Sequence, residues 1–148
     1  MRSRFVFAVP ALLLAVPLAA QSGAAATTTP VPRLDSAATI ATGRKYTEWF
    51  YSGMGDSLFA HSSAQVREKI TAQQLSEIQD QLAVQVGNEA EVLSERFVPR
   101  DTLTAYLREA RFELMEEPLV LAFTLDGHGK IYGFFIRPKS QVPADTAN

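Results

Sequence analysis

Histidine is the side chain that titrates nearest to neutral pH, and this sequence contains two, His61 and His128. Asp56 and Ser57 closely precede His61, so the sequence admits a Ser-His-Asp relay. Closeness along the chain does not provide the geometry of such a relay, and no Gly-x-Ser-x-Gly elbow accompanies these residues. We therefore interpret Asp56 as a helix cap, His61 as a helix-end residue and His128 as a solvent-exposed loop residue.

Residues that hold metals or phosphates are scarce. The absence of cysteine excludes disulfides, thiolate nucleophiles and cysteine-type zinc sites. Two distant histidines are too few for a tetrahedral site, and Asp126-Gly127-His128-Gly129 lacks the acidic series of a calcium loop. Gly53-Met54-Gly55 follows a predicted helix and lacks the signature of a phosphate loop, so we interpret it as a helix terminator. The sequence predicts no metal site and no cofactor.

Charged residues are balanced and scattered along the chain. The sequence has 14 lysines and arginines against 16 aspartates and glutamates, a formal net charge of −2. Nucleic-acid binding needs clustered basic residues, so we expect no nucleic-acid partner. We interpret Glu116-Glu117 as an exposed turn rather than a glycosidase pair. We expect Arg96, Arg108 and Arg111 to form ion pairs on a sheet rather than an anion site.

Aromatic residues are the remaining candidates for a ligand site. Tyr46, Trp49, Phe50 and Tyr51 lie within about two turns of a predicted helix, where they could line a pocket or pack as core. We take Tyr46, Trp49, Phe50 and Phe112 as the candidate ligand-binding residues, with core packing as the alternative. The sequence leaves open whether the space beside them is empty or filled.

The first half of the chain must supply the helices. Asp35 or Ser36 can cap a helix that runs to about Ser52. Asp56 can begin a short second helix, and Ser62 or Ser63 a further turn. A capping box of Thr71 and Gln74 begins the last helix, which ends at Gly87. Its expected apolar stripe consists of Leu75, Ile78, Leu82 and Val86.

Beyond Gly87 the apolar pattern alternates, which is typical of strands. We predict strands over residues 91–98, 106–114, 119–125 and 131–136, the last two joined by an Asp-Gly hairpin. Residues 102–114 also fit a helical stripe. We choose a strand there because a lone hairpin is marginally stable and needs sheet neighbours.

The predicted fold class is α+β, with N-terminal helices packed on a curved antiparallel sheet of about four strands. Alternation predicts which strand residues face inward: Phe112, Leu121, Phe123, Ile131 and Phe135. We therefore expect Phe123 and Phe135 to contact the same core from the two arms of the hairpin.

The two ends of the sequence differ from the middle. Arg2 and Arg4 precede an apolar run, which is typical of a secretory signal peptide. Residues 5–20 are shorter than the roughly 20 residues that a membrane anchor needs. We expect cleavage after Ala20 or, alternatively, before Thr27, and export to the periplasm or the exterior. Residues 1–20 form the signal peptide, 21–33 a flexible linker, 34–139 a single domain and 140–148 a disordered tail.

Several short patterns occur together between about residues 40 and 138. They are Gly55-Asp56, Phe59, Val66, Ile70-Thr71, Leu75, Gly87, Asp126-Gly-His-Gly-Lys-Ile131 and Pro138. With the order of elements, they resemble domain-of-unknown-function family 3887, whose members are similar to the cone-shaped, cystatin-like fold of nuclear transport factor 2. The resemblance implies a cone-like fold and brings no catalytic residue. Some members precede an α/β-hydrolase domain, which implies a hydrolase as a partner.

These observations favour an exported, non-catalytic binding or accessory module for a small apolar ligand or a partner protein. The first alternative is a cone-fold enzyme of the isomerase or hydratase type, which the apolar inward residues disfavour. The second is an accessory domain for an α/β-hydrolase. Pairing through the sheet would form a homodimer, and we expect no stable membrane span after processing.

Overall fold

The computed structural model describes residues 32–143. The predicted signal peptide, both cleavage sites and the last residues of the predicted tail lie outside this range. The helices are α1 (Ser36–Tyr51), α2 (Gly55–Ala60), α3 (Ala64–Arg67) and α4 (Ala72–Val86). The strands are β1 (Glu89–Arg100), β2 (Leu103–Phe112), β3 (Leu119–Leu125) and β4 (Ile131–Pro138), followed by a 3₁₀ turn, η1 (Lys139–Gln141).

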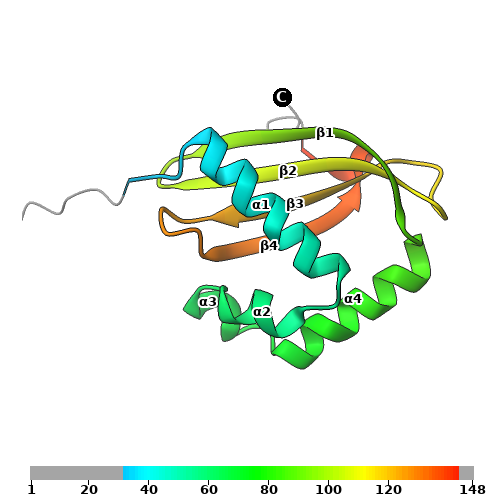
Figure 1. The fold of residues 1–148 in the computed structure, drawn as a ribbon, viewed down its shortest axis with the longest axis horizontal. Helices are drawn as coiled ribbons and strands as arrows, with labels where there is room; N and C mark the ends of the chain where they lie inside the picture. Colours follow the sequence, from blue (N-terminus) through cyan, green and yellow to red (C-terminus); the bar gives the residue numbers. More distant parts are fainter. Residues whose placement is uncertain (1–31, 144–148) are drawn as a thin grey trace, which may run out of the picture.

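The four strands form one antiparallel sheet in the order β1-β2-β3-β4. Figure 1 shows α1 lying across one face of this curved, unclosed sheet, with α2, α3 and α4 grouped on the side of β4. The predicted α+β class, with helices packed on an antiparallel sheet, is confirmed.

α1 and α4 begin at the predicted capping residues, but the prediction that Asp56 caps the second helix is wrong. α2 has Met54 at its N-cap, without a side-chain bond, and Asp56 lies inside the helix. The Asp35 carboxylate accepts a hydrogen bond from the Ala38 amide at 2.7 Å, which begins α1. Thr71 and Gln74 form the predicted capping box at the start of α4. Gly87 ends α4 with a φ of 74°, a conformation that glycine adopts at little cost.

Residues 103–112 form a strand, as predicted, although their apolar spacing also suits a helix. β2 lies between β1 and β3, so both of its edges are paired. Its residues are largely buried on both faces, which explains why neither periodicity is clear in the sequence.

The main core lies between the sheet and the helices. Tyr106 of β2 is completely buried beneath Gly43 of α1, where a Cβ atom would overlap the tyrosine ring. The glycine therefore lets α1 approach the sheet closely. The buried residues of this core are Tyr46, Phe50, Leu58, Leu75, Tyr106, Leu121, Phe123, Leu125 and Ile131.

The prediction that Phe123 and Phe135 share this core is wrong. Phe123 pairs across the strands with Phe134, and a register irregularity follows between Thr124 and Leu125. Phe135 lies opposite Ala122 and packs on the other face of the sheet. An offset of one residue reverses the face of every side chain in a strand, and two adjacent phenylalanines hide that offset in the sequence.

The other face of the sheet carries a smaller apolar cluster. Ala105, Leu107, Val120 and Ala122 are buried there, and Val142 beyond η1 packs on them. The Ser140 amide donates to the Glu117 carboxylate at 2.7 Å, which holds this segment in place. Packing against the sheet thus extends to Val142, beyond residue 139, where the predicted domain ends and the predicted tail begins.

Candidate functional site

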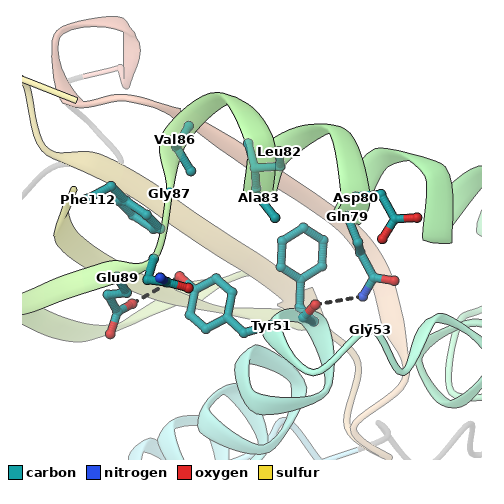
Figure 2. A pocket seen from close by; sticks show the side chains of 12 residues that line it. Tyr51, Gly53, Gln79, Asp80, Leu82, Ala83, Val86, Gly87, Glu89 and Phe112 are labelled. Atoms are coloured by element: carbon teal, nitrogen blue, oxygen red, sulfur yellow. Dashed lines mark hydrogen bonds between the residues drawn. The ribbon is translucent and has the colours of Figure 1, made fainter. Parts of the chain in front are cut away.

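A cleft of about 390 Å³ lies between the end of α1, the second half of α4 and the end of β2. Figure 2 shows Leu82, Ala83 and Val86 of α4 facing Tyr51 of α1, with Phe112 towards one end and Gln79 towards the other. The full lining is Phe50, Tyr51, Gly53, Gln79, Asp80, Leu82, Ala83, Val86, Gly87, Asn88, Glu89 and Phe112.

A buried glutamine joins the two helices that form the cleft. Nε2 of Gln79 on α4 donates to the Phe50 carbonyl of α1 at 2.8 Å. Its Oε1 atom is buried and has no hydrogen-bond partner among the described residues, and it lies against Gly55. The bond holds the end of α1 against α4, so the width of the cleft is set by the fold.

Aromatic rings form much of the cleft wall. The ring of Tyr51 is 5.9 Å from that of Phe50 and 6.2 Å from that of Phe112, both measured between centroids. Phe50 and Phe112 are buried, whereas Tyr51 is 41% exposed. Most of the aromatic surface that a ligand could contact therefore belongs to Tyr51, backed by the buried rings of Phe50 and Phe112.

A network of charged side chains begins at the Glu89 end of the cleft. The Tyr51 hydroxyl donates to Glu89 at 3.0 Å. Arg108 donates to Glu89 at 2.6 Å and 3.0 Å, and to Glu95 at 3.0 Å. Glu95 also accepts from Arg44 of α1 and from the Tyr106 hydroxyl. Two arginines thus balance two glutamates beneath α1.

Four ionisable groups of this network, Glu95, Tyr106, Tyr51 and Arg108, have pKa values shifted away from neutrality. Hydrogen bonds from Arg44 and Tyr106 lower the pKa of Glu95 to about 2, although partial burial opposes them. Burial and the bond to Glu95 raise the pKa of Tyr106 to about 12. Partial burial and the charge of Glu89 raise the pKa of Tyr51, and hydrogen bonding to Glu89 raises the pKa of Arg108. These four groups provide fixed charges and hydrogen bonds near neutral pH, not proton transfer.

The structure brings together two of the four candidate ligand-binding residues. Phe50 and Phe112 line the cleft. Tyr46 is buried in the core, where its hydroxyl donates to the Gly129 carbonyl at 2.6 Å. Trp49 packs against His61 at 4.9 Å between ring centroids and does not line the cleft.

The space beside these aromatic residues in the core is filled. The space lined by Phe50, Leu58, Leu75, Phe123 and neighbouring side chains measures about 10 Å³. A single water needs roughly 10–15 Å³ by this kind of measure. The core beside these residues is therefore nearly filled, and the cleft of about 390 Å³ lies at its edge, between the ends of α1 and α4.

Sequence reasoning missed the contribution of α4. The expected stripe used Ile78, which is 39% exposed, whereas the structure buries Gln79. Gln79 lies four residues after Leu75 and three before Leu82, so it occupies the helical position of an apolar residue. The available signal in the sequence was therefore a polar residue, Gln79, at a position where the helical pattern expects an apolar one. Nothing in the sequence around Asp80 or Glu89 indicated that these two residues would line a cleft.

The other residues singled out for chemistry lie apart from the cleft. His61 is exposed, and its Nδ1 atom is 2.9 Å from the Ser57 carbonyl, so it forms no pair with Asp56. His128 is exposed at the hairpin. Arg108 forms the expected ion pairs, and Arg111 pairs with Glu91 at 3.4 Å. Over residues 32–143 no group of three acidic or histidine side chains is placed to hold a metal ion.

Comparisons of the chain with protein families, with curated proteins and with solved structures found no match. In the part of the chain that the structure describes, every helix is too short or too polar to cross a bilayer.

Proposed function

We propose that this protein is an exported, non-catalytic binding module and that the cleft between α1, α4 and β2 holds a small ligand. The observation that carries the proposal is the contrast between a filled core and an open cleft of about 390 Å³. Small-molecule sites commonly measure about 300–1,000 Å³ and combine apolar walls with a few polar groups.

The geometry supports binding rather than catalysis. A general acid or base works best with a pKa near the operating pH, and burial or ion pairing can supply that shift. Here the pKa of Glu95 is lowered and the pKa of Tyr106 is raised, so both move away from neutral pH. The pairing of a buried His61 with Asp56, which would favour the enzyme alternative, is not formed.

Export and partnership belong to the same proposal. The charged start and short apolar run of residues 1–20 support export. The resemblance to family 3887 supports an accessory role beside an α/β-hydrolase. A homodimer through the sheet stays a prediction.

Filling the cleft is the direct test. Ala83 lines the cleft and is exposed, so Ala83→Trp should block it without disturbing the core. The matched control is Val84→Trp on the same helix, at a residue that is 79% exposed and outside the cleft lining. We expect ligand-observed NMR with a library of small aromatic compounds to find binders that Ala83→Trp abolishes and Val84→Trp retains.

Two results would contradict the proposal. One is that the library yields no binder for the unaltered chain. The other is that Ala83→Trp leaves every binder unaffected, because binding would then occur elsewhere on the molecule.

A further inference from the structure

We propose that the cleft selects a cation, an organic ammonium carried on an aromatic or other apolar body. This inference rests on the proposed function, because it names the ligand class of the same cleft. It is argued from the charges that surround the cleft and from the rings that line it.

Two helices end at the cleft. The last residue of α1 is Tyr51 and that of α4 is Val86, and both line it. The C-terminus of a helix carries a partial negative charge, which usually attracts lysine, arginine or histidine. Neither helix has a basic residue in its last turn. The C-termini of two helices thus border the cleft, and their last carbonyls accept hydrogen bonds from neutral amides rather than from a side-chain cation.

The lining side chains add negative charge. Asp80 and Glu89 line the cleft, and no lysine, arginine or histidine does so among the described residues. Glu89 is balanced by Arg108. Asp80 is exposed, and its carboxylate forms no hydrogen bond or ion pair with the described part of the chain. Its carboxylate is therefore free to pair with a cation that enters from solvent.

The carboxylate of Glu113 lies next to two residues of the cleft lining, Gly87 and Asn88. Glu113 accepts hydrogen bonds from the Asn88 backbone amide and from Nδ2 of Asn88, both at 3.1 Å. These donors are neutral, so they fix the position of the carboxylate without cancelling its charge. An anionic ligand would lie in a cleft that is lined by Asp80 and Glu89, has Glu113 next to its lining and is bordered by two helix C-termini, which disfavours that class.

The walls suit the rest of such a ligand. Tyr51 offers exposed aromatic surface, and Leu82 and Ala83 offer aliphatic surface. Aromatic faces attract cations as well as apolar groups. A metal ion would gain little from these rings, whereas an aromatic amine would use both the rings and the charges.

The test compares three compounds of similar shape: 2-phenylethylamine, 2-phenylethanol and 3-phenylpropionate. They differ in a positive, a neutral and a negative end group. At low ionic strength and neutral pH, we expect calorimetry with the full chain to rank the amine first and the carboxylate last. The amine should bind about five- to tenfold more tightly than the alcohol, the size of a partly exposed charge pair near a helix end. Added salt should reduce this preference.

Asp80→Asn removes the free carboxylate with little change of shape, and we expect it to bring the affinity for the amine close to that for the alcohol. Glu77→Gln is the matched control, because it removes the same charge from α4 outside the cleft lining. It should preserve the order of the three compounds.

Failure of this inference is distinguishable from failure of the proposed function. If the alcohol or the carboxylate binds as tightly as the amine, and Ala83→Trp abolishes that binding, the cleft binds ligands but does not select cations. If none of the three binds, the amine assignment falls, and the compound library still decides whether the cleft binds anything. If Ala83→Trp leaves amine binding intact, both proposals fall.

Discussion

Glu95 joins α1 to the sheet through side-chain hydrogen bonds. It lies on β1 and accepts hydrogen bonds from Arg44 of α1 and from Tyr106 and Arg108 of β2. Its side chain is 15% exposed, so its charge depends on these donors rather than on water. The same hydrogen bonds stabilise the carboxylate form, and the pKa of Glu95 is lowered for that reason.

We expect the stability contributed by Glu95 to depend on pH. Its pKa falls from about 4.5 to about 2 on folding, so the folded state favours the carboxylate. The contribution is therefore complete above pH 4.5 and is lost as the pH falls towards 2. Glu95→Gln should lower the free energy of unfolding at neutral pH by about 1–3 kcal/mol.

Urea unfolding at several pH values measures this effect. The difference between the unaltered chain and Glu95→Gln should shrink as the pH drops through that window. Glu91→Gln is the control, because Glu91 forms an exposed ion pair with Arg111 and should change stability by less than about 1 kcal/mol. A difference that stays constant from pH 7 to about pH 2 would contradict the assignment.

At the scale of elements, the register of β4 decides which phenylalanine faces the helices. The rings of Phe123 and Phe134 stack with centroids 6.2 Å apart, whereas Phe135 lies on the opposite face. We expect a double-mutant cycle of Phe123→Leu with Phe134→Leu to show a coupling of about 0.5–1.5 kcal/mol.

A double-mutant cycle of Phe123→Leu with Phe135→Leu is the control. Its two substitutions should add within about 0.5 kcal/mol, because the side chains are separated by the sheet. Chemical unfolding of the single and double variants gives both values. Coupling of Phe123 to Phe135 and not to Phe134 would instead support the register that simple alternation predicts.

The helices and strands were largely predictable, because the residues that begin and end them act on positions close by in the sequence. Asp35 and Thr71 cap their helices through side-chain bonds a few residues along the chain, and Gly87 ends α4 by its own conformation. The register of β4 was not predictable, because it depends on an irregularity at Leu125 between residues that are apolar on both faces.

The cleft was predictable only in part, because it depends on contacts between distant segments. Phe50 and Phe112 could be named from their type alone. Gln79 binds the carbonyl of a residue 29 positions earlier, and Glu89 is positioned by Arg108 across a strand pair. No spacing along one element encodes such contacts, so the polar half of the cleft emerged only from the assembled fold.

At the scale of the whole molecule, export is the property that the sequence predicts most specifically. We expect the mature chain to begin near Gln21 or Thr27, because small residues precede both positions after a short apolar run. Mass spectrometry of the protein recovered from a secreting host measures its first residue. An intact Met1 in that exported material would overturn the prediction.

The burial of Tyr106 beneath Gly43 has a consequence for the time at which the chain folds during synthesis. α1 is made first, but the surface on which it packs comes from β2, β3 and β4, which are made last. Until those strands are complete, α1 exposes its apolar stripe and has no tertiary partner on the sheet. The strands then pair with their neighbours in chain order, which involves short loops and favours rapid closure once the last strand is available. The packing of α1 on the sheet is thus a late event in synthesis, because its partners arrive only when residues 103–138 have been made.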